Sequence, residues 1–501
     1  MKLPLSVYNY SLALIVCFIA GLIAVFAFEP FAQAWLIFPA LAVLFYYWSQ
    51  SSSPKQAFIL GLVFGYGLFG LGVSWVYVSL STYGGMPLWM GGIAVFGFVG
   101  LLAIFIGLAG YVLVKLSPAK GFERLILLAP IWVIFEWLKG WVLTGFPWLE
   151  IGYTQTTTWL FALAPIGGVY LISFIIVILS CLLSAIVLKP RFWLYPASFI
   201  GLIILLIPLT KLDWSDDTGA PINVGLVQTN IPIESKWQAG QRDEIITRFR
   251  TMSEQMHASS NIDLFIWPET ALPLLLQQTD TDFWNSITPS GTALLTGLMD
   301  NPSNNEFYNS AVLSCAGQQQ IYRKRHLVPF GEYLPLRFLF DWVLDYLQLP
   351  MSDLSAWSGK QSLQCPDKNI NLGLSICYED AFSSEWRRHI GDASLLVNIS
   401  EDAWFGDSFA PHQRLQMAQM RAREFSRPLV RSANTGPSVV IDQLGKVQAS
   451  TEQFVVQSLS YSVQPQTGET WYKRFGNWVV ILSFCIISII VLRDSLSNKR
   501  A

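Results

Sequence analysis

The sequence predicts an α-helical membrane bundle of about eight spans, joined to a layered α/β domain on the outer side of the membrane. The first observation behind this prediction is the composition, because 52% of the 501 residues are hydrophobic and only 13% are charged. Soluble globular chains carry about 25% charged residues. The second observation is a set of apolar runs long enough to cross a bilayer. The third is one long segment of mixed composition between the last two runs.

The apolar runs are the expected membrane-spanning helices, and the second and the fifth of them are short for that purpose. Their bounds are 9–28, 33–48, 57–80, 88–114, 124–139, 159–188, 192–210 and 477–492. The sequence therefore predicts three regions. A transmembrane domain with seven spans covers 1–210, an outer domain covers 211–475, and a last span with a cytoplasmic tail covers 476–501.

Basic residues in the connecting loops predict the orientation of the chain. They gather in alternate loops and near both ends, as Lys2, Lys55, Lys115, Lys120, Arg124, Lys189, Arg191, Arg493, Lys499 and Arg500. The intervening loops FEPFA and STYGGMP have no Lys or Arg. Because positively charged loops stay in the cytoplasm, both termini should be cytoplasmic and segment 211–475 periplasmic in a Gram-negative cell. No basic stripe accompanies the net charge of −2, so nucleic acid is not an expected partner.

The outer region alternates apolar or β-branched runs with helical stretches, which predicts an α/β or layered α-β domain. The expected strands include 222–229, 262–269, 292–298, 309–315, 370–379, 393–400 and 437–443, and the expected helices include 242–258 and 412–427. Three cysteines lie in this region, so at least one thiol stays free. Cys315 and Cys365 could form a disulfide outside the cytoplasm, but the sequence leaves that pairing open.

Three polar clusters follow expected strands and indicate nucleophilic catalysis at a carbonyl carbon. They contain Glu269 after IDLFI, Lys324 within YRKRHLVPFGE and Cys377 within GLSICYED. The acidic residues beside Cys377 should raise the pKa of its thiol, so the thiolate needs a nearby cation. Lys324 could supply that charge and later bind an oxyanion. Glu269 could accept the thiol proton, and Glu332 could hold the lysine in place.

The motifs WPET, YRKRHLVPFGEYLP and ICYED, in this order, resemble the Glu–Lys–Cys core of the nitrilase superfamily. With eight spans around it, the chain resembles the apolipoprotein N-acyltransferase family. The similarity extends to FPWLEIGY, QTNIPIESKW, YNS, DAWFG and RSANTG, so it covers nearly the whole chain. It implies a nitrilase-like α-β-β-α sandwich, catalytic roles for Glu269, Lys324 and Cys377, and no cofactor. One departure is Glu401, because the family pattern has Asn before DAWFG. A charge at this position would alter the electrostatics of the pocket if it lies there.

The resemblance also implies a two-step acyl transfer in the bacterial inner membrane. Cys377 would attack an acyl ester of a phospholipid, become a thioester and release the lysophospholipid. The N-terminal α-amine of a diacylglyceryl-cysteine apolipoprotein would then take the acyl chain as an amide. Both partners are anchored in the lipid bilayer, so the site should face the membrane. Two alternatives remain open: a membrane-tethered amidase or nitrilase with the same triad, and a transporter with an outer binding domain.

Residues around the triad are expected to support it or to bind substrate. The supporting residues are Glu332, Tyr378 and Glu379. Trp148 and Trp237 either line a lipid pocket or belong to the interfacial aromatic belt. Asn309 either orients a substrate or closes a turn, and residues 337–348 form either a core helix or an arm that dips into the bilayer. None of the four histidines is paired at ligand spacing, so no metal site is expected.

Overall fold

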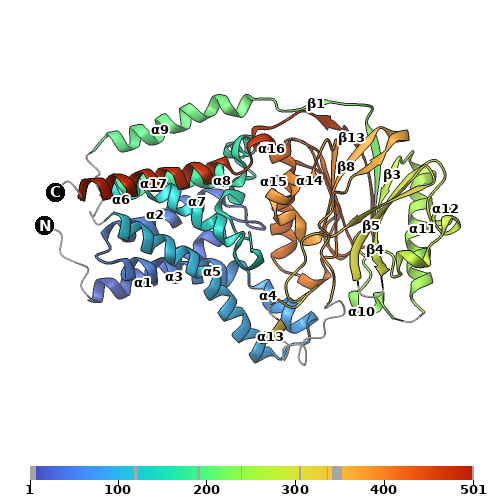
Figure 1. The fold of residues 1–501 in the computed structure, drawn as a ribbon, viewed down its shortest axis with the longest axis horizontal. Coiled ribbons are helices and arrows are strands. Elements are labelled where there is room, and N and C mark those ends of the chain that lie inside the picture. The colour runs from blue at the N-terminus through green and yellow to red at the C-terminus, as the bar shows by residue number, and fades with distance from the viewer. Residues whose placement is uncertain are drawn as a thin grey trace. The chain divides into compact units, whose positions relative to one another are not determined.

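The chain divides into two compact units, which are described one at a time (Figure 1). The computed structural model describes residues 7–117, 122–188, 192–238, 240–303, 306–335, 337–340 and 353–498. The first unit comprises Met1–Tyr77, Leu88–Asp213 and Arg474–Ala501, and the second comprises Val78–Pro87 and Trp214–Lys473. The short segment Val78–Pro87 thus belongs to the second unit, although the residues on either side of it in the sequence belong to the first.

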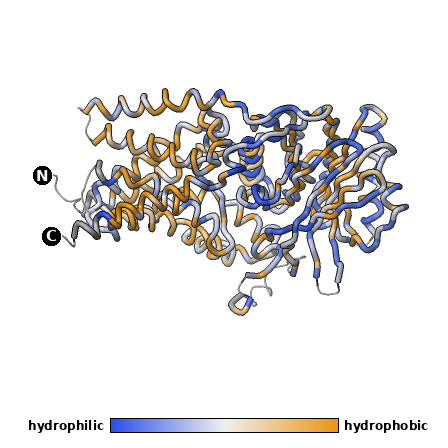
Figure 2. The backbone as a smooth tube through the Cα atoms, turned by 45° about the horizontal axis from the view of Figure 1, so that its top comes forward, coloured by the Kyte–Doolittle hydropathy of each residue, from blue (hydrophilic) through white to orange (hydrophobic). Residues whose placement is uncertain are grey.

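The first unit is helical, and a helix lies in each of the eight predicted apolar runs. Its helices are α1 (Val7–Val25), α2 (Ile37–Gln50), α3 (Pro54–Gly72), α4 (Trp75–Val78), α5 (Leu88–Leu116), α6 (Phe122–Leu125), α7 (Leu128–Lys139), α8 (Ala164–Leu188), α9 (Leu194–Leu206) and α17 (Trp478–Asn498). Figure 2 shows that these helices are mainly hydrophobic. Close packing between α1 and α3 depends on glycine. A Cβ at Gly21 would come within 2.1 Å of the Phe64 carbonyl oxygen, and one at Gly67 within 2.3 Å of the Phe18 carbonyl oxygen.

Four segments of the described chain are long and apolar enough to cross a membrane. They are Pro54–Gly72, Leu88–Leu116, Trp159–Leu188 and Leu194–Lys211. Shorter apolar helices cover Tyr10–Val25, Ala34–Gln50 and Trp478–Arg493. The fifth predicted run is interrupted between α6 and α7, and α7 is only 12 residues long. The membrane character is therefore supported, whereas the number of eight spans stays a prediction. Of the basic residues that predicted the orientation, Lys2, Lys120, Lys189, Arg191, Lys499 and Arg500 lie outside the described residues.

The described residues of the second unit form two six-stranded sheets and a short ribbon. The first has the order β13-β2-β3-β4-β5-β6 and the second β12-β11-β10-β9-β8-β7. The strands of the first are β2 (Ile222–Gln228), β3 (Leu264–Ile266), β4 (Ala293–Ser303), β5 (Glu306–Cys315), β6 (Gln318–Arg323) and β13 (Gln457–Val463). Those of the second are β7 (Leu363–Cys365), β8 (Ile370–Ile376), β9 (Leu395–Ser400), β10 (Leu429–Ala433), β11 (Val439–Ile441) and β12 (Val447–Ser450). A separate ribbon pairs β1 (Asp216–Asp217) with β14 (Gln466–Thr467).

The helices of the second unit are α10 (Ile233–Lys236), α11 (Arg242–Ser259), α12 (Thr281–Ile287), α13 (Arg337–Phe340), α14 (Ser383–His389), α15 (Ala410–Phe425) and α16 (Trp471–Phe475). Four of them, α11, α12, α14 and α15, cover the outer faces of the sheets. Apolar side chains of α11 and α12 pack on the first sheet, and those of α14 and α15 pack on the second. Of the predicted segment 337–348, only α13 is described; residues 341–348 lie outside the described residues.

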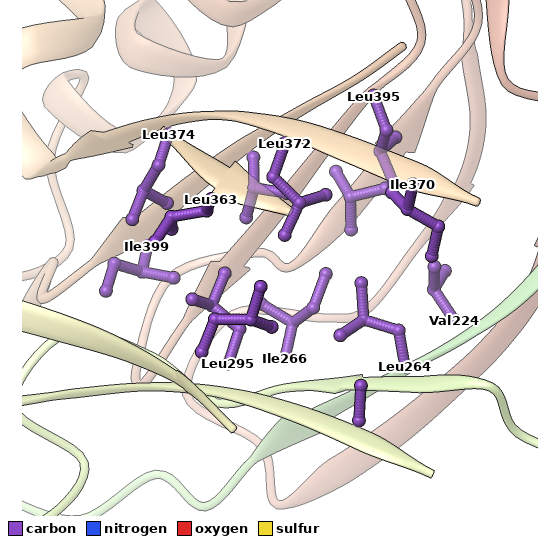
Figure 3. Packing of buried hydrophobic residues seen from close by; sticks show 14 of the residues in the cluster. Val224, Leu264, Ile266, Leu295, Leu363, Ile370, Leu372, Leu374, Leu395 and Ile399 are labelled. Atoms are coloured by element: carbon purple, nitrogen blue, oxygen red, sulfur yellow. The ribbon is translucent and has the colours of Figure 1, made fainter. Parts of the chain in front are cut away.

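The two sheets pack face to face over an apolar core. Figure 3 shows Leu264 and Ile266 of the first sheet opposite Leu372, Leu395 and their neighbours of the second. Burial of alternate side chains on each inner face is the main favourable contribution to such a sandwich. With helices on both outer faces, this arrangement confirms the predicted nitrilase-like α-β-β-α sandwich.

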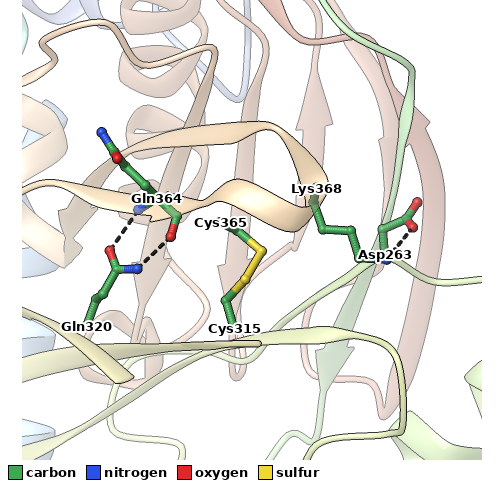
Figure 4. Close-up of a disulfide and its surroundings, with 6 residues drawn as sticks. All are labelled: Asp263, Cys315, Gln320, Gln364, Cys365 and Lys368. Atoms are coloured by element: carbon green, nitrogen blue, oxygen red, sulfur yellow. Dashed lines mark hydrogen bonds and ion pairs between the residues drawn. A yellow bond between two sulfur atoms is a disulfide. The ribbon is translucent and has the colours of Figure 1, made fainter. Parts of the chain in front are cut away.

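A disulfide between Cys315 and Cys365 joins the two sheets (Figure 4). Cys315 ends β5 and Cys365 ends β7, and both are buried. The side-chain amide of Gln320 also bridges the sheets, because it exchanges two hydrogen bonds with the backbone of Gln364, of 2.6 and 2.8 Å. The pairing that the sequence left open is therefore present, and it leaves Cys377 as a free thiol.

Candidate active site

The strand directions bring the three predicted clusters to one edge of the sandwich. In the first sheet β3 and β4 are parallel, and β5 is antiparallel to both β4 and β6. β6 therefore runs in the direction of β3, so Lys324 and Glu269 both follow carboxyl ends at the same edge. In the second sheet Cys377 follows β8, which is parallel to β9. Carboxyl ends of parallel strands are a common place for functional groups in α/β folds.

Glu269 is buried, and fixed donors hold both of its carboxylate oxygens. Its Oε1 accepts a hydrogen bond of 2.7 Å from Asn309 Nδ2, and its Oε2 accepts one of 2.8 Å from the backbone N–H of Glu401. The turn that carries Glu269 lies directly on Gly297 of β4. A Cβ at Gly297 would come within 2.7 Å of the Glu269 Cα, so only glycine admits this turn.

Lys324 is also buried, and its ammonium lies between two carboxylates. Its Nζ is 2.8 Å from Glu332 Oε1 and 3.5 Å from Glu269 Oε1. Asn309 Nδ2 donates to the same oxygen of Glu332 over 2.9 Å, so the amide and the ammonium join both acids into one network. The nearby carboxylates raise the pKa of Lys324 although burial opposes this, and the side chain therefore stays a cation.

Cys377 lies at the junction of β8 and a short 3₁₀ helix, Cys377–Ala381, and has a left-handed backbone conformation with φ of +51°. Non-glycine residues rarely adopt this conformation and often do so at functional sites. Burial, followed by the negative charge of Glu269, raises the pKa of the Cys377 thiol to about 12, while Arg414 and Lys324 act in the opposite direction. The resting thiol is therefore protonated at neutral pH and needs a base when it reacts.

Glu379 connects the cysteine segment to the lysine segment. One of its oxygens accepts hydrogen bonds from the backbone N–H of Arg325 (2.7 Å) and of His326 (3.3 Å), which follow Lys324. The other accepts from the backbone N–H of Ile376 (2.7 Å), which precedes Cys377. Burial raises the pKa of Glu379 to about 7. This geometry suits a positioning role, as does that of Tyr378, whose buried ring packs against Phe382.

Glu401, the residue that departs from the family pattern, is buried beside Glu269. Its carboxylate forms an ion pair with the buried Lys236 and accepts hydrogen bonds from Asn434 Nδ2 of 3.0 and 3.2 Å. The added negative charge therefore lies inside the protein and is compensated locally by Lys236. Burial raises the pKa of Glu401, and Lys236 opposes this effect.

The structure adds charged residues that the sequence did not single out. Arg414 of α15 lies 3.6 Å from the Cys377 sulfur, and Asp402 links Arg414 to Arg431 of β10. All three side chains are buried. Asp402 and Arg431 occur in DAWFG and RSANTG, two motifs that carried the family resemblance, so a signal for them was present. Arg414 lies on a polar helical stretch, where an exposed arginine is the ordinary expectation.

The predicted substrate-binding residues lie in different places. Asn309 contacts Glu269 and Glu332 and thus belongs to the network around the lysine. Trp237 follows α10 in the second unit and is 42% exposed. Trp148 belongs to the first unit, where it is buried and its ring stacks on Phe146. Contacts of Trp148 and Trp237 with lipid stay predictions.

Comparisons with known proteins agree with this arrangement. Residues 20–182 match the family model for the apolipoprotein N-acyltransferase N-terminal domain, and residues 223–473 match that for carbon-nitrogen hydrolase. The apolipoprotein N-acyltransferase of Methylococcus capsulatus is 38% identical over 478 residues, 94% of each chain. That of Nitrosomonas europaea is 35% identical over 501 residues, 98% of each chain. This chain belongs to the apolipoprotein N-acyltransferase family. Membership confirms the predicted resemblance and the enzyme class, an N-acyltransferase. Family membership does not favour the alternative functions of a membrane-tethered amidase or a transporter, because the similarity to these relatives extends through both units.

Proposed function

We propose that this protein transfers a fatty acyl chain from a membrane phospholipid, through a thioester on Cys377, to the N-terminal α-amine of a diacylglyceryl-cysteine apolipoprotein. Family membership supports the reaction. The observation that carries the site assignment is the buried network of Glu269, Lys324, Asn309 and Glu332, together with the burial of Cys377 near enough for the charges of Glu269 and Lys324 to act on its thiol.

In the first step, the Cys377 thiol loses its proton to Glu269 as the sulfur attacks the ester carbonyl carbon. The carbon–sulfur bond forms, and the negative charge that develops on the carbonyl oxygen is stabilised by Lys324 and by the backbone N–H that follows Cys377. The ester carbon–oxygen bond then breaks. The lysophospholipid oxygen takes the proton from Glu269 and leaves, and the acyl chain remains as a thioester.

In the second step, the neutral α-amine of the apolipoprotein attacks the thioester carbonyl. Glu269 accepts a proton from the attacking nitrogen and returns it to the departing sulfur. An amide forms and the thiol is regenerated, so one site serves two lipid-anchored substrates in turn. Asn309 and Glu332 fix Glu269 and Lys324 through both steps, and Glu379 holds the two reacting segments together.

The membrane topology belongs to the same proposal. Eight spans in a bacterial inner membrane would place both termini in the cytoplasm and the catalytic region 211–475 in the periplasm. The alternation of basic loops supports this orientation. The disulfide between Cys315 and Cys365 supports it independently, because disulfides persist in the periplasm and are rare in the cytoplasm.

Intact-mass measurement after incubation with a phospholipid in detergent tests the proposal. Wild-type protein should gain the mass of one acyl chain, which hydroxylamine should remove because thioesters are labile to it. Cys377→Ala should gain no such mass. Cys485→Ala is the matched control, because Cys485 is an exposed free cysteine that could become acylated nonspecifically. A labile adduct that persists in Cys377→Ala, or that disappears in Cys485→Ala, would overturn the assignment of the nucleophile.

A further inference from the structure

Arg414 contacts the cysteine at two points. Its Nη1 lies 3.6 Å from the Cys377 sulfur, and its Nη2 donates a 2.8 Å hydrogen bond to the Cys377 carbonyl oxygen. The side chain is 1% exposed and comes from α15, an element that carries none of the triad residues. One planar group therefore reaches both the reacting atom and the backbone of the nucleophile.

Two buried acids hold the guanidinium in this position. Nη1 donates to Asp402 Oδ1 over 2.6 Å, and Nη2 donates to Asp380 Oδ2 over 2.8 Å. Asp402 is held in turn by Arg431 Nη2, 2.6 Å from its Oδ2. A guanidinium directs its donors in a fixed planar fork, so these partners leave it little freedom. A lysine at this position would have neither the fork nor the same reach.

We propose that Arg414 is a further catalytic residue, whose guanidinium stabilises the Cys377 thiolate and holds the cysteine in its left-handed conformation. The inference rests on the proposed role of Cys377 as the nucleophile. It adds a second cation to the site, beside Lys324, and gives it a separate task. Lys324 binds the oxygen of the substrate carbonyl and also favours ionisation of the thiol, whereas Arg414 contacts the sulfur itself.

The charges that face the sulfur explain why a second cation is needed. Glu269, after β3, and Asp402, after β9, both oppose ionisation of the thiol, and burial opposes it more strongly. Lys324, after β6, favours ionisation, but its ammonium already lies between Glu269 and Glu332. Arg414 also favours ionisation, and it does so in direct contact with the sulfur.

The second task concerns the backbone. A left-handed conformation is strained for cysteine and persists only where its surroundings enforce it. The Cys377 carbonyl oxygen accepts hydrogen bonds from Arg414 Nη2 and from Asn398 Nδ2, the latter over 3.3 Å. These two donors fix the peptide plane that follows Cys377, and with it the backbone N–H expected to face the oxyanion.

The rate of Cys377 alkylation by iodoacetamide across a pH series tests the electrostatic task without acyl transfer. Full-length protein with the Cys485→Ala substitution is used in detergent, and the labelled peptide is identified by mass. Arg414→Met should be alkylated about tenfold or more slowly than its parent at pH 8, because a nearby opposite charge lowers a pKa by roughly 1–3 units. Arg421→Met is the matched control, since Arg421 is an equally buried arginine of α15 that pairs with Glu424. Arg421→Met should lower the stability of the protein but leave the pH dependence of the Cys377 alkylation rate unchanged.

Arg414→Lys provides the second variant. It keeps the positive charge but loses the fork, so it should be alkylated faster than Arg414→Met and form the acyl-enzyme about tenfold or more slowly than wild type. If the alkylation rate of Cys377 in Arg414→Met depended on pH as it does in the parent protein, the inference would be overturned. Should that variant not fold, a wild-type acylation rate in Arg414→Lys would overturn it instead. Absence of an acyl-enzyme in wild type would count against the proposed function alone, because alkylation does not depend on it.

Discussion

Replacement of Lys324 by Met should slow acylation of Cys377 by about 10³-fold or more and also destabilise the second unit, and a second substitution should separate these two effects. The Lys324 ammonium is 2.8 Å from Glu332 and 3.5 Å from Glu269, and the side chain is 1% exposed. Without it, two buried carboxylates share the Asn309 amide and lack a cation. Removing one partner of a buried ion pair costs about 3–5 kcal/mol of unfolding free energy.

The double variant Lys324→Met with Glu332→Gln removes one of the two uncompensated charges. Glu269 then keeps its hydrogen bonds from Asn309 (2.7 Å) and from the Glu401 backbone (2.8 Å). Most of the lost stability should therefore return. Acylation should not return, because the cation that assists the thiol and binds the oxyanion is still missing. Loss of one oxyanion donor slows characterised enzymes by about 10²–10³. The weaker ionisation of the thiol adds about a further factor of 10 or more.

The assay pairs the single-turnover rate of acyl-enzyme formation, measured by intact mass, with thermal unfolding of the same samples in detergent. Lys368→Met is the matched control. It breaks a partly exposed ion pair with Asp263 of 3.1 Å, which should be worth at most about 1 kcal/mol, and should leave acylation unchanged. Acylation at the wild-type rate in Lys324→Met would refute the triad assignment. Recovery of acylation in the double variant would show that the lysine only neutralises Glu332.

Three further predictions follow from other parts of the chain. The double variant Cys315→Ala with Cys365→Ala should lose about 2–4 kcal/mol of unfolding free energy, because it opens a loop with a sequence separation of 50. The variant should still acylate Cys377 at low temperature, and loss of acylation in folded protein would contradict this prediction. A periplasm-active reporter fused after Asp213 should be active and one fused after Arg191 silent, and the reverse activities would overturn the proposed orientation. Glu401→Gln leaves Lys236 buried without its ion pair, so thermal unfolding should show a loss of about 3–5 kcal/mol; because the Glu401 backbone N–H still holds Glu269, acylation measured at low temperature should fall less than tenfold.

The sequence alone determined the features that depend on local runs of residues. Apolar length predicted the membrane helices, because hydrophobic burial acts on contiguous segments. The alternation of basic loops predicted an orientation, which stays a prediction. The motifs around Glu269, Lys324 and Cys377 predicted the chemistry, because each carries its functional group within about three residues of the end of a strand. The predicted strand 370–379 ends at Ile376, where the chain turns at Cys377. No local sequence pattern predicts the left-handed backbone conformation of this cysteine, because residues from other strands and helices enforce that conformation.

Only the tertiary structure decided which charges meet. Arg414 lies on a helix whose polar sequence predicts exposure, yet the packing of α15 against the second sheet buries it beside Cys377. Arg431 lies within the buried strand β10, and its charge is compensated by Asp402, which follows the end of another strand. Likewise, the sequence marked Glu401 as unusual but could not pair it with Lys236. The energy of a buried charge depends on the partner and dielectric around it, and residues distant along the chain set both.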